Sequence, residues 1–196
     1  KPEDYGDYFA WGETATKEDY SWATYTWMQT GQSSYEYINQ YTFADNQKDG
    51  VWYDGDTFVG DGKTSLADYD YADDAARQIW KGTWRIPTDE EWTALRNEDN
   101  FEWTWTDDYL GDGTNVKGMV VKSKVSGYEG NTIFLPAAGY RSGTSLGLAG
   151  SYGYYWSSSL YEGFSDDARS VSFNSGGAYR YSNFRYRGFS VRPVSE

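Results

Sequence analysis

The hydrophobic positions of residues 1–65 follow neither the 3.6-residue period of a helix nor the two-residue period of a strand. This part of the chain is aromatic and acidic, has few aliphatic residues, and contains turn-forming sequences at 46–50 and 54–56. We therefore expect long loops whose indole rings pack into the interior. The tryptophans expected to pin these loops are Trp11, Trp22, Trp27 and Trp52.

Two short helices are expected next. In residues 71–80, four apolar side chains recur at helical spacing, and a glycine soon afterwards is a stop signal. These side chains are Ala72, Ala75, Ala76 and Ile79. The second helix begins at a capping box, with Thr88 as the N-cap and Glu91 three residues later. Its residues Trp92 and Leu95 should face inward.

From residue 100 onward the hydrophobic period changes to two, which is typical of strands. The alternation or apolar character is clearest at 118–124, 131–136, 154–159, 169–173 and 189–191. In the fourth of these segments, Val171 and Phe173 should face the core while Ser170 and Ser172 face the opposite side. Irregular chain, two helices and then strands indicate an α+β fold with an antiparallel sheet and long aromatic-rich loops. The length favours a single domain over residues 1–196.

The composition excludes several kinds of catalytic site. The 196 residues include no cysteine and no histidine. Disulfides, thiol nucleophiles, thiolate zinc sites, histidine-ligated metals and Ser-His-Asp catalysis are therefore ruled out. Among the remaining carboxylates, the pair Glu90 and Glu91 is accounted for by helix capping, and neighbours on one helix turn do not face each other across a substrate bond. We expect no enzymatic activity and no catalytic residues.

The charge balance limits the partners. A net charge of -13 repels phosphate backbones and anionic lipid surfaces, so we expect neither nucleic acid binding nor direct membrane insertion. No apolar run approaches the roughly eighteen residues that a membrane span needs. The chain opens almost at once on an aromatic segment and shows no secretion signal, so we expect that an upstream piece is missing from it.

The last part of the chain differs chemically from the rest. Residues 151–196 contain seven tyrosines, eleven serines, five glycines and no lysine, and they carry a net charge of +1, whereas residues 1–150 carry -14. Antibody binding loops use the same mixture, because tyrosine gives broad contact at low entropic cost and serine and glycine adapt their hydrogen bonds. The alternative is an ordinary surface loop whose rings stack on its arginines. Residues 179–187 are too polar on both strand faces for a core strand.

Residues 163–187 contain no Lys, Glu, Gln, Met or Trp. These are the residue types that cannot be reached by mutating only the two adenines of an AAC codon. The stretch therefore has the composition that adenine-directed diversification would leave, although a Ser/Gly/Tyr-rich loop can show the same absence by chance.

Four motifs, at 5–14, 84–88, 135–139 and 188–194, together resemble the Fibrobacter/Bacteroidetes major paralogous domain. That family is a branch of the C-type-lectin-like proteins related to the formylglycine-generating enzyme fold. The segment 154–159, followed by the tail, also resembles the variable proteins of diversity-generating retroelements, which occur in gut Bacteroidetes and their phages. The resemblance implies a C-type-lectin-like fold that carries a variable ligand-binding face on a stable scaffold. The family's enzymes use cysteine or histidine, which this chain lacks.

Carried onto this sequence, the resemblance makes Trp156 and 188–194 scaffold and makes 152–187 the variable ligand-binding face. Val171 and Phe173 should be fixed because they face the core. The positions expected to face solvent and bind the ligand are Tyr161, Gly163, Phe164, Ser165, Asp166, Asp167, Ser170, Ser172, Tyr179, Tyr181, Ser182, Phe184 and Tyr186. Asn174 and Asn183 are further candidates.

The expected function is non-catalytic recognition of a protein or glycan receptor, outside the cell, on the cell surface or on a phage particle. The alternative is a surface adhesin of fixed carbohydrate specificity on the same fold. No cofactor and no metal ligand are expected, with calcium as the one candidate ion because many lectin-type folds bind it. The acidic loops that could supply oxygen ligands are Asp54, Asp56 and Asp61, or Asp107, Asp108 and Asp112. Neither loop has EF-hand spacing.

Overall fold

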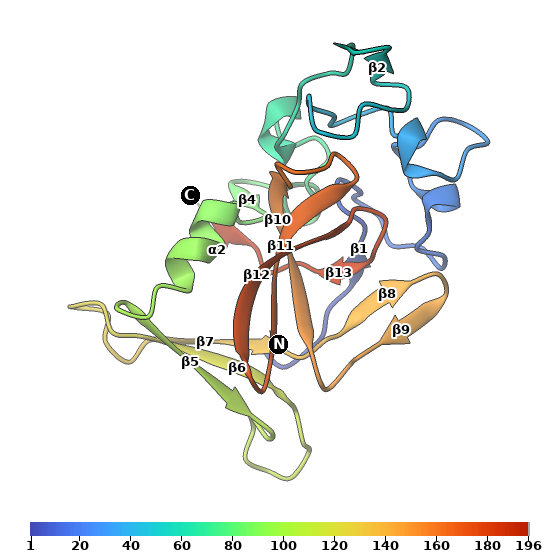
Figure 1. Ribbon diagram of the computed structural model, residues 1–196. Helices are drawn as coiled ribbons and strands as arrows, with labels where there is room; N and C mark the ends of the chain where they lie inside the picture. Colours follow the sequence, from blue (N-terminus) through green and yellow to red (C-terminus); the bar gives the residue numbers. More distant parts are fainter. Residues whose placement is uncertain (196) are drawn as a thin grey trace.

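The computed structural model describes residues 1–195 and shows an α+β fold, made mostly of strands in several small sheets with two α-helices (Figure 1). The central sheet has the strand order β1-β13-β10-β11-β12. Its strands are β1 (Tyr8–Phe9), β13 (Phe189–Ser190), β10 (Gly153–Leu160), β11 (Asp167–Asn174) and β12 (Gly177–Phe184). All neighbours pair antiparallel except β10 and β13, which run parallel and meet at Tyr155 and Ser190.

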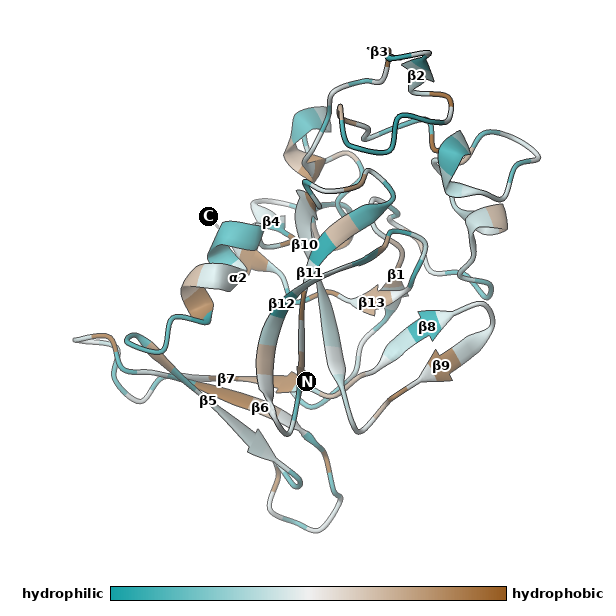
Figure 2. Cartoon of the chain, viewed as in Figure 1, coloured by the Kyte–Doolittle hydropathy of each residue, from teal (hydrophilic) through white to brown (hydrophobic). Residues whose placement is uncertain are grey.

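A second sheet of three antiparallel strands packs against the central one. It has the order β5-β6-β7 and consists of β5 (Phe101–Thr106), β6 (Gly118–Ser123) and β7 (Thr132–Pro136). Figure 2 shows the apolar character of β6 and β7 beside the mixed character of β12. Trp92, Met119, Leu135, Val171 and Phe173 form one buried cluster between this sheet and the central sheet.

Three two-stranded ribbons complete the described sheets. They are β2 (Tyr53–Asp54) with β3 (Thr57–Phe58), β8 (Tyr140–Ser142) with β9 (Ser145–Gly147), and β4 (Trp84–Arg85) with β14 (Val194–Ser195). The 3₁₀ helices of the N-terminal loops are η1 (Trp22–Thr24), η2 (Tyr35–Tyr37) and η3 (Leu66–Tyr69). The rest of residues 10–65 is mostly irregular chain, as the sequence predicts.

The two predicted helices are present, and the first is shorter than expected. Helix α1 (Ala75–Trp80) begins only after Asp74, whose carboxylate accepts the Arg77 amide at 3.0 Å. The chain cannot be helical before that point because Tyr71 has a left-handed backbone with φ 58°. Of the four side chains at helical spacing, Ala75 and Ala76 are buried, whereas Ala72 and Ile79 are exposed.

Helix α2 (Asp89–Leu95) confirms the capping box. The Glu91 amide donates to Thr88 Oγ1 at 3.2 Å, and the Thr88 amide donates to the Glu91 carboxylate at 2.8 Å. Trp92 is buried, and its indole N–H donates to the Trp156 carbonyl. Capping therefore accounts for this acidic segment.

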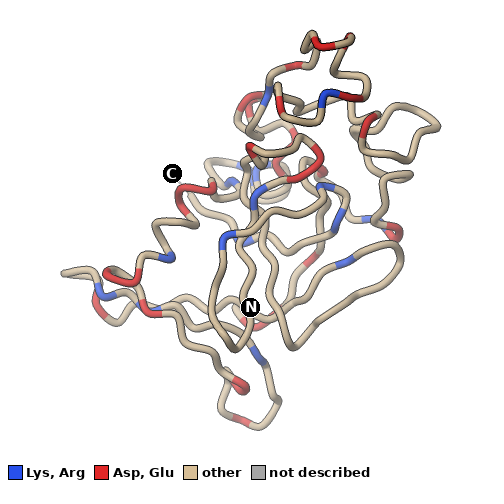
Figure 3. The backbone as a smooth tube through the Cα atoms, in the orientation of Figure 1, with Lys and Arg blue, Asp and Glu red and all other residues tan. Residues whose placement is uncertain are grey.

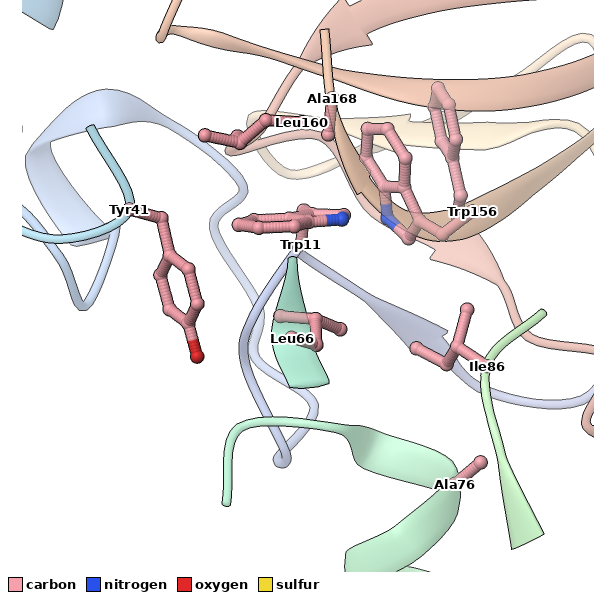
Figure 4. Packing of buried hydrophobic residues seen from close by; sticks show 9 residues of the cluster. Trp11, Tyr41, Leu66, Ala76, Ile86, Trp156, Leu160 and Ala168 are labelled. Carbon is pink, nitrogen blue, oxygen red and sulfur yellow. The ribbon is translucent and has the colours of Figure 1, made fainter. Parts of the chain in front are cut away.

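Tryptophans pin the N-terminal loops to the central sheet. The indole of Trp11 donates to the Ser157 carbonyl and that of Trp156 to the Phe9 carbonyl, both at 2.8 Å. Figure 4 shows Trp11 and Trp156 within one cluster that also draws on α1 and η3. Trp52 is also buried, whereas Trp22 and Trp27 are only half-buried. The prediction is thus confirmed for Trp11 and Trp52 and only partly for Trp22 and Trp27.

Candidate functional site

Strand β12 forms one edge of the central sheet, and its register with β11 decides which side chains share a face. Ser172 of β11 lies opposite Tyr154 of β10 on one side and Tyr179 of β12 on the other. Ser170 lies in the same way between Trp156 and Tyr181. Because directly opposite residues in antiparallel strands point to the same side, two small serines are flanked by rings on this face.

Further rings extend this surface beyond β10. Tyr154 packs edge-on against Tyr140 of β8, with ring centroids 5.3 Å apart, and lies nearly parallel to Tyr152 at 6.0 Å. Burial raises the pKa of Tyr154 above its ordinary value, with the nearby rings of Tyr140 and Tyr152 adding to the effect. The Tyr154 phenol therefore stays neutral at physiological pH and acts as a hydrogen-bonding apolar ring.

Arg187 joins these rings to a second group of aromatics. Its guanidinium lies 5.3 Å from the Tyr140 ring centroid and 5.7 Å from that of Phe184, which is within cation–π range. Phe184 stacks on Tyr186 at 5.7 Å, and Tyr186 packs against Trp22 of η1 at 4.8 Å. Arg187 thus links the rings of Tyr140 and Tyr154 to those of Phe184, Tyr186 and Trp22, which come from segments far apart in the chain.

We call this surface the aromatic face. Its members are Trp22, Tyr140, Tyr152, Tyr154, Tyr179, Tyr181, Phe184, Tyr186 and Arg187. Tyr179 and Tyr181 belong to it by their register with Ser172 and Ser170, and the other members belong to it by ring and cation–π contacts. Phe184 pairs with Asp167 and so points to the other side of β12, but it joins the face at its edge through Arg187 and Tyr186.

Tyr181 is 58% exposed, Tyr179 48% and Phe184 40%, so these rings are available to a partner. Because an aromatic cluster rimmed by polar groups is typical of interaction sites, this is the strongest candidate for a functional surface.

Four of the positions predicted to face solvent are buried: Ser165, Asp166, Ser170 and Ser172. Ser170 and Ser172 lie on a central strand, where the flanking rings cover a short side chain. Ser165 is fully enclosed because its hydroxyl bonds to the main chain of Phe43 and its amide donates to Asp45. The exposure implied by the resemblance is therefore wrong for these four residues. For Ser170 and Ser172 the strand register gives the side of the sheet, but it does not show that neighbouring rings cover them.

The remaining predicted residues lie on both faces of the sheet. Asp167 and Ser182 share the face opposite the tyrosines, where the Ser182 hydroxyl donates to the Asp167 carboxylate at 2.8 Å. Tyr161 stacks on Arg169 at 4.4 Å and packs near Phe164 at 6.2 Å. Gly163 is half-buried against the Tyr161 ring. The predicted residues therefore do not form one surface, and only part of them belongs to the aromatic face.

On the same opposite face, four charged side chains form a network. Arg180 donates to both oxygens of Asp89, at 2.8 Å and 3.1 Å from its Nε, and Arg169 pairs with Glu162. The hydrogen bonds that Arg180 donates to Asp89 raise the pKa of Arg180. This network ties β11 and β12 to the first turn of α2. The side chains of Glu162, Arg169 and Arg180 are therefore paired within the molecule.

Asn183, a further candidate of the sequence, is buried. Its amide donates to Ser170 Oγ at 3.1 Å, and its oxygen accepts from Arg187 at 3.0 Å. Asn183 is thus a link between β11 and Arg187 and holds the arginine among the rings. Asn174, at the end of β11, is half-buried and accepts the Gly176 amide in the hairpin turn.

Arg185, which directly follows β12, anchors the end of this strand in the interior. Its side chain is completely buried, and it donates to the Tyr25 hydroxyl and to the carbonyls of Gln40, Tyr41 and Ser165, all at 2.9–3.0 Å. The rings of Trp11, Tyr25 and Tyr41 surround it at 5.0–5.9 Å. The guanidinium therefore fixes the N-terminal loops beneath the aromatic face.

The acidic loops considered for calcium make local hydrogen bonds. The Asp61 carboxylate accepts the amides of Tyr41 and Thr42 at 2.7 Å, and Asp112 accepts the Thr114 amide at 3.0 Å. Asp107 pairs with Lys117 at 3.3 Å. The other aspartates of these two loops are Asp54, Asp56 and Asp108. Within residues 1–195, no three acidic side chains are grouped so that they could hold a metal ion.

The sequence does not place Trp22 and Tyr140 on the aromatic face. They reach it through contacts with residues far away in the chain, and hydrophobic alternation says nothing about such pairs. Tyr152, Tyr154 and Arg187 lie within the predicted binding segment 152–187, but they are not among the residues predicted to contact the ligand. Only the register of β10 on β11 assigns Tyr154 to the same side as Tyr179.

Comparison with known proteins adds one observation. Residues 122–194 match the model of a family described as a domain of unknown function, DUF8237. No curated protein and no solved structure matches the chain. No helix in residues 1–195 has the length and apolar character needed to cross a membrane. The matched segment includes β10, β11 and β12, so the chain is similar to that family over the strands that carry the aromatic face.

Proposed function

We propose that the protein is a non-catalytic binding protein that recognises a macromolecular receptor through the aromatic face. The observation that carries this proposal is the group of exposed rings on β12, which lie beside further rings from η1, β8 and β10. Leaving Tyr181 58% exposed on a sheet edge contributes little to folding, whereas a receptor that buries it would gain apolar contact and a phenol hydrogen bond.

The scaffold is proposed to be C-type-lectin-like. The motifs that suggest this family are brought into contact with one another. β1 pairs with β13, with Tyr8 opposite Ser190, and β4 pairs with β14. The Tyr8 hydroxyl donates to the Ala138 carbonyl at 2.6 Å, which links the first motif to the third. Contact among these otherwise distant motifs supports a common scaffold role.

The part of the aromatic face within 152–187 is further proposed to belong to the variable surface of a diversity-generating-retroelement protein, displayed outside the cell or on a phage particle. In support, Tyr179, Tyr181, Phe184 and Tyr186 are all residues that an AAC codon reaches through its adenines, and the first three are exposed. A near-identical gene copy with asparagine codons at these positions, beside a reverse transcriptase gene, is the expected genomic context. A single invariant face among strains would instead favour a fixed carbohydrate-binding adhesin.

Receptor capture tests the proposal. The wild-type protein and the double variant Y179A/Y181A are applied to arrays of glycans and of bacterial surface proteins. The wild type should give a reproducible signal and the double variant should lose it, because two hot-spot tyrosines contribute about 2 kcal/mol each. The melting temperatures of the two proteins should agree within a few degrees, since both rings are exposed.

Tyr128 supplies the matched control. It is 64% exposed, on the turn between β6 and β7 and outside the aromatic face. Y128A removes an equally accessible phenol and should leave capture unchanged. Equal capture by wild type, Y179A/Y181A and Y128A would show that the aromatic face does not bind the receptor.

A further inference from the structure

A second surface, distinct from the aromatic face, is hollowed between α2 and β7. The hollow has a volume of about 440 Å³, which lies within the range of roughly 300–1,000 Å³ typical of small-molecule sites. Its apolar lining includes Trp92, Leu95, Tyr109, Ile133, Phe134 and Pro193. None of the residues that define the aromatic face lines it.

The walls of this groove are apolar and fixed by packing. Tyr109 and Phe134 stack in parallel, with ring centroids 3.8 Å apart and planes within 3°. Trp92 is buried with its indole N–H directed to the Trp156 carbonyl, so its polar atom is already satisfied. Ile133 lies on β7, an edge strand of its sheet, and remains 44% exposed. An isoleucine left this open inside a preformed hollow gains from an apolar occupant.

One charged group at the groove lacks a counterion. Arg192 donates to the carbonyls of Phe134 and Pro2, and among residues 1–195 no carboxylate lies within ion-pair distance of it. This is notable in a chain of net charge -13. Glu91, the acidic residue of the lining, is held at 2.7 Å by both terminal nitrogens of Arg85, which lowers the pKa of Glu91.

We propose that this groove binds a small molecule with an apolar body and a single carboxylate. The apolar body would cover Ile133 and the Tyr109–Phe134 stack, and the carboxylate would pair with the guanidinium of Arg192. A charge-assisted pair of this kind selects an anion over a neutral or cationic molecule of the same length.

Calorimetric titration with decanoate, 1-decanol and decylammonium tests the proposal on the wild-type protein. Decanoate should bind with one-to-one stoichiometry and at least tenfold more tightly than 1-decanol, and decylammonium should bind more weakly still. Equal affinity for decanoate and decylammonium would overturn the proposal, because Arg192 would then have no part in recognition.

Two variants locate the binding. I133D places a charge in the groove and should abolish decanoate binding, whereas L146D, at a residue that is 43% exposed on β9, should leave it unchanged. R192Q should reduce the affinity for decanoate at least tenfold and that for 1-decanol little. Decanoate binding that survives I133D would place the ligand elsewhere and contradict the proposal, even if R192Q fails to fold.

Discussion

At the scale of single residues, Arg185 shows that the tail contains buried structural residues as well as exposed ones. It belongs by sequence to the Tyr/Ser/Arg-rich segment, yet every donor contact given above joins it to main-chain carbonyls or to Tyr25. A buried guanidinium is stabilised only while its hydrogen bonds are complete, because removing either side leaves desolvated polar groups unpaired.

R185M should therefore lower the free energy of unfolding by about 3 kcal/mol or more, which corresponds to a fall of roughly 6–12 °C in melting temperature. Thermal unfolding measures this. K48M is the control, since Lys48 and its partner Asp56 are both exposed, and it should change stability by no more than about 1 kcal/mol. A similar small effect from both substitutions would show that Arg185 does not anchor the loops.

Asp166 is another buried charged residue of the tail, and its pKa follows from its surroundings. Burial raises the pKa from the ordinary value of 3.8 to about 6, and the nearby carboxylates of Asp167 and Asp45 add to the rise. Because the folded state holds the proton more tightly, this group favours folding most below pH 4. That contribution is lost as the pH rises through about 6.

D166N should consequently stabilise the protein by about 2–3 kcal/mol above pH 6 and by almost nothing near pH 4. Denaturant unfolding of the wild type and the variant between pH 4 and pH 7.5 measures the difference. A gain that does not depend on pH, or a loss at pH 7.5, would mean that Asp166 has a partner that keeps its charge favourable.

At the scale of elements, the alternation of apolar residues locates β6, β7, β10 and β11 to within two residues of each end. It works where one side of a strand is apolar, as with Val171 and Phe173, which are buried as predicted. Strand β12 shows no such contrast, because residues of the segment 179–187 are polar or aromatic on both faces. All but one of the side chains of β12 are exposed or half-buried, on both faces of the strand, so they carry no clear periodic signal.

The pairing of β10 with β11 depends on a glycine. A Cβ at Gly153 would lie 2.1 Å from Cζ of the buried Phe173 ring, and neither the ring nor the strand can move away cheaply. G153A should lower the free energy of unfolding by about 2 kcal/mol, as measured by denaturant titration. G176A, in the hairpin turn where the nearest atom is the flexible Asn174 side chain at 3.0 Å, should have a much smaller effect. Equal effects would contradict the packing explanation.

At the scale of the whole molecule, the acidic side chains and the rings of the aromatic face occupy different regions. Figure 3 shows the acidic residues mostly in the peripheral loops and helices around the central sheet. The sequence predicts a tail distinct from an acidic body, and it predicts the α+β class. It does not predict the aromatic face as an assembled surface, because contacts such as Trp22 with Tyr186 join residues far apart in the chain. Such contacts depend on how the N-terminal loops fold over the sheet, for which local patterns carry no information.

The central claim is that the rings of β12 contact the receptor directly. Hydroxyl-radical footprinting of the protein alone and in complex with the captured receptor measures this at each side chain. The account predicts that oxidation of Tyr179 and Tyr181 falls several-fold in the complex while that of Tyr128 is unchanged. Unaltered oxidation of Tyr179 and Tyr181, with protection elsewhere on the molecule, would contradict it.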